Sequence, residues 1–458
     1  MSLWTAGDIA AATGGAVSTE FAASGVTFDS REVGPGDVFV ALKGDATDGH
    51  HFLDQAFARG ASGAIVSEQT RYPHVHVADT TAALAALAVA ARRRTAASIV
   101  GVTGSVGKTG TKEALYACLE RVAPGGAHRS VKSYNNHTGV PLSLARMPQD
   151  TRFGVFEMGM NHAGELAALT RLVRPHVTII TIVASVHLEF FDDEAAIADA
   201  KAEIFQGLEP GGTAIIPFDS PHRARLVAAA QAHAGRIITF GTGAGADVRP
   251  LETMRTPGGG TFVTAQLAGC ELSFTINQPG DHWVMNALAV LAAVEALGQD
   301  VAVAALALAE MGGLAGRGAR IAVPLAGGGA ALILDESYNA NPTSMRATLA
   351  VLAAEAAPRK LVALGAMGEL GAGSDVFHAG LADPVLAAGV SYAILVGAAM
   401  APLVKALEGR VEIVHVPDAA TALGCLKKIL APGDAVLIKG SNSVGLGAVV
   451  AGLAGGTP

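Results

Sequence analysis

The fold of this chain is decided by the stretch Ser98-Ile99-Val100-Gly101-Val102-Thr103-Gly104-Ser105-Val106-Gly107-Lys108-Thr109. It starts as an apolar run typical of a buried strand, turns through two glycines and continues as a helical pattern to about Arg121. Such a turn presents backbone N–H groups to phosphate oxygens at a helix N-terminus, with a lysine as point charge and a threonine hydroxyl for Mg²⁺. Val102 replaces the first glycine of the strict phosphate-loop pattern, so a glycine turn without a phosphate role is the alternative. We expect ATP at residues 103–109.

Further apolar runs follow this loop, at Phe153 to Phe156 and Val177 to Val183, with helical patterns between them. Continuous apolar runs are typical of parallel strands that are buried on both faces. The alternation therefore predicts a doubly wound, mostly parallel α/β sheet that carries the phosphate loop. Thr261 to Leu267 and Glu271 to Ile276 alternate instead between apolar and polar residues, which predicts a β-hairpin beside the sheet.

The length of 458 residues argues for about three domains. We expect a smaller α/β domain over residues 1–95, the central sheet over residues 96–316, and a Rossmann-like α/β domain over residues 317–458. The third domain has apolar runs at 331–334, 361–364, 393–396 and 435–438. Arg92-Arg93-Arg94 closes the first domain and is interpreted as a solvated helix end.

Composition excludes several classes of protein. Half of the residues are hydrophobic and 16% are charged, which excludes disorder. The longest apolar stretches are too short to span a bilayer, and the N-terminus lacks a secretory signal, so we expect a cytoplasmic protein. A net charge of -8 disfavours nucleic acid as the main partner. Three widely separated cysteines exclude a disulfide framework and a cysteine zinc site, and we expect them to be free and buried.

Two polar residues follow the apolar runs of the central sheet. Glu157 ends the run at 153–156, and His187 comes after the run at 177–183. Both should emerge at the carboxyl edge of the sheet, where open α/β folds bind ligands. A carboxylate and a neutral imidazole there can complete a Mg²⁺ shell that Thr109 begins, although either residue could instead cap a helix or face solvent.

Lys201 lies on an apolar stripe of a helix expected over about residues 193–208. The stripe comprises Ile197, Ala200, Ile204, Phe205 and Leu208. An ammonium group in that position is costly unless it is paired or neutralised. The lysine could extend to the helix edge or pair with a carboxylate. Alternatively it reacts with CO₂, and the resulting carbamate offers oxygen ligands to a metal.

Other polar clusters have less specific chemistry. Asp335 to Pro342 offers a carboxylate for a ribose hydroxyl, an aromatic face and amides, or is a simple turn. Arg317 between two glycines could contact phosphate or mark a hinge, and His282 and Asn286 could bind a nucleotide or cap a helix.

Taken together, these residues resemble the Mur ligases, ATP-dependent amide-forming enzymes of peptidoglycan precursor synthesis, over essentially the whole chain. The resemblance implies that Lys108, Glu157, His187 and a carbamylated Lys201 are catalytic, and that Thr109, Glu157, His187 and Lys201 hold two Mg²⁺ ions. It implies that ATP is bound by Thr103, Gly104, Ser105, Val106, Gly107, Lys108, Thr109, His282, Asn286, Arg317, Asp335, Tyr338 and Asn339.

Three strings look most similar to the family branch that joins D-alanyl-D-alanine to UDP-N-acetylmuramoyl-tripeptide. They are residues 135–142 (Asn-Asn-His-Thr-Gly-Val-Pro-Leu), 157–165 and 337–342. The resemblance implies substrate contacts by Ser30, Arg31, Lys43, Asp48, His50, Asn135, Asn136, Thr138, Asn161, His162 and Ser441. It also implies a monomer whose first domain holds the UDP-linked peptide and whose third holds the dipeptide and closes on ATP. Residues 439–446 depart from the family, which usually has arginine where Asn442 stands.

The implied reaction passes through an acyl phosphate that the amine of the dipeptide then attacks. Two alternatives remain at this point. One is another ligase of the family, which would add a single amino acid to a UDP-muramoyl or folate-like acceptor. The other is a P-loop ATPase or a nucleotide-sugar binding protein, which would have no use for the carboxylate, imidazole and lysine set.

Overall fold

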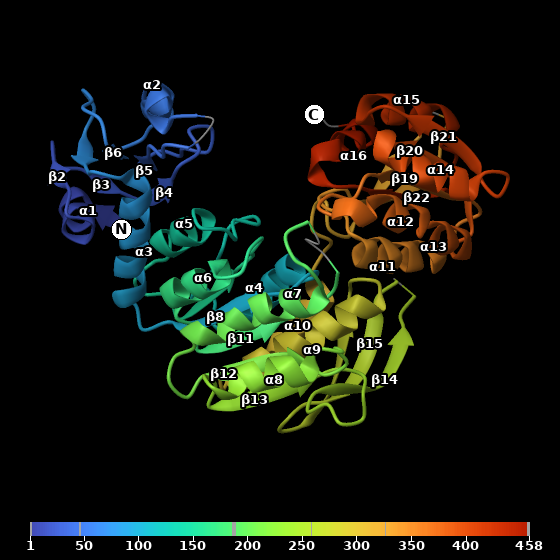
Figure 1. Ribbon diagram of the computed structural model, residues 1–458, viewed down its shortest axis with the longest axis horizontal. Coiled ribbons are helices and arrows are strands. Elements are labelled where there is room, and N and C mark those ends of the chain that lie inside the picture. Colours follow the sequence, from blue (N-terminus) through green and yellow to red (C-terminus); the bar gives the residue numbers. More distant parts are fainter. Residues whose placement is uncertain (1, 45–46, 186–188, 258, 326, 456–458) are drawn as a thin grey trace.

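A computed structural model describes residues 2–44, 47–185, 189–257, 259–325 and 327–455. Figure 1 shows three α/β domains, with the N-terminal and C-terminal domains on either side of the central one. Each domain is built on its own mostly parallel sheet, so the expected fold class is confirmed. Within the described residues, no helix is long and apolar enough to cross a membrane.

The N-terminal domain has a five-stranded sheet in the order β2-β7-β6-β5-β4, in which β4 to β7 run parallel and β2 is antiparallel. A separate antiparallel pair, β1 and β3, lies beside it. The elements are β1 (Trp4–Thr5), α1 (Ala6–Thr13), β2 (Ala16–Val17), β3 (Ala22–Ala23), β4 (Gly25–Thr27), β5 (Asp37–Val40), the 3₁₀ helix η1 (Gly49–Phe52), α2 (Leu53–Ala58), β6 (Gly63–Val66), β7 (His74–His76) and α3 (Thr80–Arg93).

The central sheet is parallel throughout, in the order β13-β12-β11-β8-β10-β9. Its first elements are β8 (Ser98–Thr103), α4 (Lys108–Val122), β9 (Ala127–Arg129), α5 (Gly139–Ala145), β10 (Phe153–Glu157), α6 (Glu165–Val173) and β11 (Val177–Ile180). They are followed by α7 (Glu194–Ala202), η2 (Glu203–Gly207), β12 (Thr213–Pro217), α8 (Arg223–Gln231), β13 (Arg236–Phe240), α9 (Asp281–Ala296) and α10 (Val301–Glu310).

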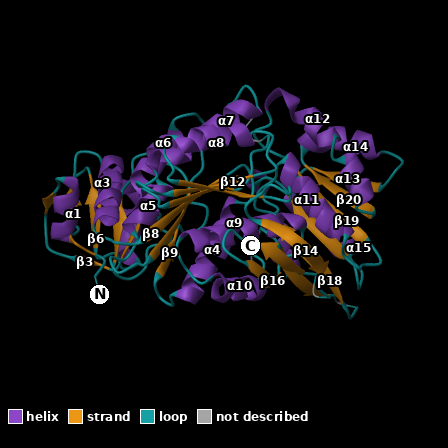
Figure 2. Ribbon diagram, turned by 90° about the horizontal axis from the view of Figure 1, so that it is seen from below, coloured by secondary structure: helices purple, strands orange, loops and turns teal. Residues whose placement is uncertain are grey.

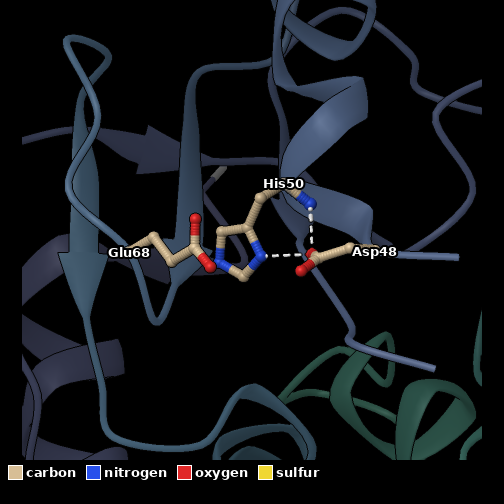
Figure 3. A group of neighbouring side chains, drawn as sticks. All are labelled: Asp48, His50 and Glu68. Atoms are coloured by element: carbon tan, nitrogen blue, oxygen red, sulfur yellow. Dashed lines mark hydrogen bonds and ion pairs between the residues drawn. The ribbon is translucent and has the colours of Figure 1, made fainter. Parts of the chain in front are cut away.

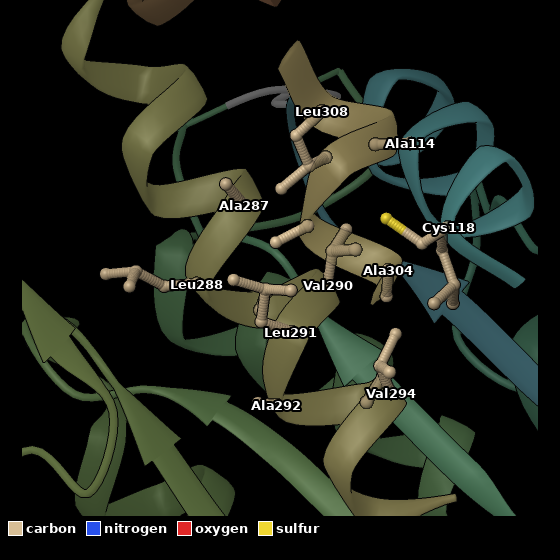
Figure 4. Close-up of a cluster of buried hydrophobic side chains, with 14 of the residues drawn as sticks. Ala114, Cys118, Ala287, Leu288, Val290, Leu291, Ala292, Val294, Ala304 and Leu308 are labelled. Atoms are coloured by element: carbon tan, nitrogen blue, oxygen red, sulfur yellow. The ribbon is translucent and has the colours of Figure 1, made fainter. Parts of the chain in front are cut away.

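Helices cover both faces of this sheet because neighbouring residues on its strands point to opposite sides. Val100 and Val102 of β8 pack into a core with α4, α9 and α10, whereas Ile99 packs into a second core with α5 to α8. Figure 2 shows α6, α7 and α8 on one face and α4, α9 and α10 on the other. In Figure 4, side chains of α4, α9 and α10 meet in the first core, around Cys118.

An antiparallel sheet of three strands, β14 (Arg249–Arg255), β15 (Thr261–Gln266) and β16 (Glu271–Ile276), flanks the central sheet. The predicted hairpin is β15 with β16, and β14 is an additional strand that the sequence analysis did not find. Most of the side chains of β14 are exposed, so it has little of the apolar pattern on which such a prediction depends.

The C-terminal sheet has the order β17-β18-β22-β19-β20-β21, and only the edge strand β17 is antiparallel. Helices α11 to α14 cover one face, and α15 and α16 the other. The elements are β17 (Ala319–Pro324), β18 (Ala330–Glu336), α11 (Pro342–Ala353), β19 (Lys360–Gly365), η3 (Gly371–Gly373), α12 (Ser374–Ala379), α13 (Ala382–Ala387), β20 (Val390–Val396), η4 (Ala398–Met400), α14 (Ala401–Leu407), β21 (Glu412–Val416), α15 (Ala419–Ile429), β22 (Ala435–Lys439), η5 (Asn442–Val444) and α16 (Gly447–Leu453).

Three local expectations were wrong. The helix expected over residues 193–208 ends at Ala202 and continues as the tighter η2, where Gly207 packs against the backbone of Thr170 so closely that a side chain would not fit. Arg92 is a buried residue that donates hydrogen bonds to two backbone carbonyls, not part of a solvated helix end. Of the three free cysteines, Cys118 is buried, Cys425 is partly buried and Cys270 is exposed.

Candidate active site

The phosphate loop joins β8 to α4, as the sequence predicts. Gly104 and Gly107 have φ angles of 150° and 88°. A Cβ atom on Gly104 would lie 1.9 Å from the hydroxyl of Thr181, and one on Gly107 would lie 2.9 Å from Oδ1 of Asn286. Both glycines are therefore required by close approach as well as by backbone conformation. Lys108 donates a 2.7 Å hydrogen bond from Nζ to the carbonyl of Gly104, which closes the loop around its own lysine.

Glu157 lies at the end of β10, beside the first turn of α4. Its Oε2 accepts a 2.8 Å hydrogen bond from the hydroxyl of Thr109, and its Oε1 accepts one of 2.8 Å from Nδ2 of Asn135. The carboxylate is buried, with 1% of the residue exposed. Two ligand oxygens bound side by side in an octahedral Mg²⁺ shell lie roughly 3 Å apart. The hydroxyl of Thr109 and the carboxylate of Glu157 therefore fit a Mg²⁺ ion in both donor type and spacing.

Two lysines, Lys108 and Lys201, lie in this region in a poorly solvated setting. Burial lowers the pKa of Lys108, although the nearby Glu157 opposes this shift. Lys201 is 2% exposed, and burial, followed by repulsion from Lys108, holds its pKa well below the ordinary value. Within the described residues, no carboxylate lies within ion-pair distance of its ammonium. His187 lies outside the described residues.

The start of α9 covers the phosphate loop. Asn286 lies against Gly107 and leaves no room for a side chain there. His282 is partly buried, and desolvation, followed by repulsion from Lys439, lowers its pKa to about 4. Of the two residues that the sequence analysis assigned to nucleotide binding on α9, Asn286 therefore lies at the loop, and a contact of His282 with the nucleotide stays a prediction.

Arg317, Asp335 and Tyr338 form one unit at the start of the C-terminal domain. The Arg317 guanidinium carbon lies 4.3 Å from the centre of the Tyr338 ring. Asp335 accepts hydrogen bonds from the backbone of Gly316 at 2.7 Å and from the Ser337 hydroxyl at 2.6 Å. The Asp335 carboxylate thus connects the loop that carries Arg317 to the loop that carries Tyr338. A contact of this carboxylate with a ribose hydroxyl stays a prediction. Asn339 accepts a 2.8 Å hydrogen bond from Lys439 on its carbonyl.

The substrate candidates of the N-terminal domain make local contacts. The Ser30 hydroxyl donates to Gln55 at 2.8 Å, and Arg31 pairs with Asp29. Asp48, His50 and Glu68 come together in a group that resembles a metal site (Figure 3). His50 has no nitrogen free for a metal, because Nδ1 lies 2.6 Å from Asp48 and Nε2 accepts the Ser67 N–H at 2.9 Å. Lys43 lies 3.6 Å from Asp48 and 4.0 Å from Glu68, so a cation already serves both carboxylates.

The other substrate candidates differ in exposure. Asn136 accepts hydrogen bonds at the start of α5 from the hydroxyl of Thr138 and the backbone of Gly139. Asn161 and His162 are exposed and are held by Glu165. The buried Ser441 hydroxyl accepts the N–H of Gly368 at 2.8 Å.

The structure therefore brings the phosphate loop, Glu157, Asn135 and Asn286 together, and it reveals residues that the sequence analysis missed. Lys112 and Glu32 contact Ser130 and Lys132, which lie near Asn135 in the sequence, and Ser133 is hydrogen bonded to Tyr338. For Lys112 a signal existed, since it lies one turn after Lys108 on the same helix as a cation among largely buried residues. For the other two, the partners are distant in sequence and no local pattern marks them.

Three family profiles match consecutive parts of the chain: the Mur ligase family catalytic domain over residues 22–107, the Mur ligase middle domain over 102–294 and the Mur ligase glutamate ligase domain over 320–442. A UDP-N-acetylmuramoyl-tripeptide–D-alanyl-D-alanine ligase from Rickettsia prowazekii is 30% identical over 98% of this chain and 99% of its own length. The protein of the same name from Escherichia coli K12 is 34% identical over 93% of both chains.

Solved structures agree with these matches. A crystal structure of MurF from Acinetobacter baumannii has a TM-score of 0.84 and 31% identity over 99% of both chains. The MurF ligase from Thermotoga maritima in complex with ADP has a TM-score of 0.77 and 27% identity, over 94% of this chain and 97% of that one. Fold and site thus define an ATP-dependent ligase of three α/β domains. The chain belongs to the Mur ligase family.

Proposed function

We propose that this chain joins D-alanyl-D-alanine to the terminal carboxylate of UDP-N-acetylmuramoyl-tripeptide in peptidoglycan precursor synthesis. ATP is consumed, and ADP and phosphate are released. The observation that carries the proposal is the Thr109 and Glu157 pair beside a phosphate loop, in a chain that matches ligases of this name over nearly its full length.

The reaction has two balanced steps. A carboxylate oxygen of the tripeptide attacks the γ-phosphorus of ATP, the bond to the bridging oxygen of ADP breaks, and an acyl phosphate forms. The dipeptide amine then attacks the acyl carbon, an amide bond forms, and phosphate leaves as the amine loses a proton. Because a carboxylate and an ATP tail repel each other, positioning and charge neutralisation dominate the first step.

This chain's residues supply those two effects. Lys108 and the N-terminus of α4 bind the β- and γ-phosphates. Thr109 and Glu157 would hold a Mg²⁺ ion, with His187 as a further ligand. The ion would neutralise charge on the transferring phosphoryl group. Asn135 orients Glu157 through its amide, and Asn286 lies against Gly107 of the loop. His282, on the same helix α9, would contact the nucleotide.

We further propose that Lys201 carries a carbamate. Burial and the neighbouring Lys108 favour its neutral amine, which is the form that reacts with CO₂. The product would place two oxygens where an ammonium group is poorly tolerated, and would provide ligands for a second Mg²⁺ ion.

The division of labour between the domains follows the three substrates. Residues 1–95, with Ser30, Arg31, Lys43, Asp48 and His50, would hold the UDP-linked peptide, and residues 96–316 would hold ATP. Residues 317–458 would hold the dipeptide and close on ATP through Arg317, Asp335, Tyr338 and Asn339. A monomer suffices for this scheme, and the cytoplasm supplies both ATP and the UDP-linked precursor.

The decisive experiment is phosphate release from ATP in the presence of UDP-N-acetylmuramoyl-tripeptide, with and without D-alanyl-D-alanine. The proposal requires release that depends on both substrates and yields the pentapeptide product by mass spectrometry. Single amino acids with UDP-muramoyl and folate-like acceptors are the controls for other ligases of the family. Release that ignores the dipeptide would contradict the proposal and favour an ATPase.

A further inference from the structure

Lys112 is a fully buried cation on the helix that begins at the phosphate loop. Its side chain is 0% exposed, one turn after Lys108. Nζ donates to the carbonyls of Ser130 at 2.9 Å and Lys132 at 2.6 Å, and lies 2.9 Å from Oε1 of Glu113. Two of the three ammonium protons are therefore donated to carbonyls, and the charge is paired with a carboxylate. The burial of this charge is therefore compensated, and the lysine ties α4 to the chain that follows β9.

The residues that Lys112 holds also position the candidate metal ligand. The Ser130 hydroxyl accepts the N–H of Glu157 at 2.9 Å. Asn135 accepts the N–H of Gly159 on its carbonyl at 2.8 Å and donates from Nδ2 to Oε1 of Glu157. Residues 130–136, which we call the bridging segment, thus run along the end of β10 and fix the Glu157 carboxylate from both backbone and side chain.

The bridging segment also contacts the other two domains. Lys132 pairs with Glu32 of the N-terminal domain, and the Tyr134 hydroxyl donates to the same carboxylate at 3.2 Å. Glu32 follows Ser30 and Arg31 directly, which are candidates for binding the UDP-linked peptide. On the other side, the Ser133 hydroxyl is hydrogen bonded to the hydroxyl of Tyr338, whose ring stacks on Arg317. The segment therefore lies where the three domains meet.

The backbone of this segment needs support from outside. Lys132 adopts a left-handed conformation with φ of 54°, although it is not glycine. The carbonyl of this residue is one of the two that Lys112 holds. An apolar residue at position 112 would fill the space, but it would leave both carbonyls without their donor and the strained turn without its anchor.

We propose that Lys112 is a positioning residue, which fixes the bridging segment against the phosphate-loop helix so that Asn135 and Glu157 are aligned with the acceptor when ATP is bound. The proposal rests on the proposed ligase function. A misplacement of about 1 Å can reduce the rate of an aligned reaction on the order of a hundredfold. Nucleotide binding depends instead on residues 103–109. The Lys112 ammonium contacts none of these residues, since its partners are Glu113, Ser130 and Lys132, so ADP affinity should not depend on it.

The test compares Lys112→Met with Thr111→Val, a matched control on the same helix. Thr111 is also fully buried, and its hydroxyl has no hydrogen-bond partner among the described residues. The control therefore removes a buried polar atom without breaking a hydrogen bond among those residues. For Lys112→Met we expect kcat/KM for UDP-N-acetylmuramoyl-tripeptide to fall about a hundredfold, while ADP affinity changes less than about threefold. Hydrogen exchange of residues 130–136 should become faster. The control should match the parent protein in all three measurements.

Folded Lys112→Met with unchanged kcat/KM and unchanged exchange would overturn the proposal, as would an equal loss of ADP affinity and kcat/KM. If this variant does not fold, Lys112→Gln replaces it, because its amide keeps a donor with a shorter reach. The same three measurements and the same outcomes then apply. The proposed function fails separately, if the parent protein shows no dipeptide-dependent phosphate release. In that case, exchange rates and ADP affinity still show whether Lys112 holds the segment.

Discussion

The hydroxyl of Thr109 lies 2.8 Å from Oε2 of Glu157, so the first turn of α4 is joined directly to the end of β10. The two strands β8 and β10 are neighbours in the sheet, and their carboxyl ends place the phosphate loop and the carboxylate at one edge. The carboxylate is thus oriented by the hydroxyl on one side and by Asn135 on the other. A single substitution in this pair should separate metal binding from nucleotide binding.

Thr109→Val should nearly abolish turnover. The change keeps the volume but removes the hydroxyl oxygen, which we expect to bind Mg²⁺, and frees Glu157 from its donor. We expect kcat to fall about 100-fold to 1,000-fold, which is the range for losing one group that stabilises developing charge. Phosphate release as a function of Mg²⁺ concentration measures the effect, with Thr111→Val as the control. Full activity at ordinary Mg²⁺ concentrations would contradict the assignment of Thr109 as a ligand.

The stack of Arg317 on Tyr338 leads to a prediction about nucleotide affinity. Tyr338→Leu removes the ring that orients the guanidinium, and an exposed contact of this kind contributes up to about 1 kcal/mol. We expect Kd for ADP to rise about fivefold in titration calorimetry. Tyr338→Phe keeps the ring and loses the hydroxyl, so its ADP affinity should equal that of the parent. Equal affinities for both variants would show that Arg317 does not depend on the ring.

Lys201 should be modified in active protein. In ¹³C-bicarbonate, the parent protein should show a carbamate carbon signal, and Lys201→Met should lack it. The same variant should lose nearly all turnover, and added bicarbonate should not restore it, because no amine remains to react. Near-normal kcat in Lys201→Met, or a parent protein without the signal but with full activity, would refute the carbamate.

The central fold could be predicted because its strands are buried on both faces. Ile99 and Val100 enter different cores, so β8 is one continuous apolar run, and the same holds for the other interior strands. The sequence analysis named no strand at β12, although β12 is an interior strand whose five residues are all buried. Among the other strands that it missed, β14, β17 and β21 lie at sheet edges. Their side chains are largely exposed or partly exposed, so their sequences carry no comparable signal.

The sequence could predict only those site residues that directly follow a recognisable strand. The phosphate loop and Glu157 follow apolar runs directly, and position alone places them at the sheet edge. The bridging segment has no such signature, because Lys112, Glu32 and Tyr338 reach it from three separate parts of the chain. The prediction that Arg92 is solvated was wrong for the same reason, because the carbonyls to which it donates lie at the end of α6, distant in sequence.

Arg92 therefore gives a stability prediction. Its guanidinium donates at 2.9 Å to the carbonyls of both Val173 and Arg174, and Arg92→Met would leave these groups without a charged donor. We expect the free energy of unfolding to fall by about 3 kcal/mol. The neighbouring Arg93 is exposed, so Arg93→Met is a matched control and should change stability by less than about 0.5 kcal/mol. Urea unfolding of both variants measures the difference in unfolding free energy. Equal stabilities would support the original interpretation that Arg92 lies at a solvated helix end.

His128 should make stability depend on pH. Burial lowers its pKa to about 4, against an opposing hydrogen bond to the carbonyl of Ser143, at 2.8 Å from Nε2. The unfolded chain has the ordinary pKa of about 6.5, so it binds a proton that the folded protein does not bind between these values. Unfolding is therefore favoured as pH falls from about 6.5 to 4, and we expect a loss of about 2 kcal/mol from this residue.

His128→Gln keeps an amide donor for Ser143 but cannot titrate. The difference in unfolding free energy between the parent and this variant should shift in favour of the variant as pH falls through that window, and should stay constant above pH 7. Comparing the two proteins cancels the titration of other groups, because these are present in both. Parallel curves from pH 7 to pH 4 would mean that His128 takes up its proton in the folded protein as readily as in the unfolded chain.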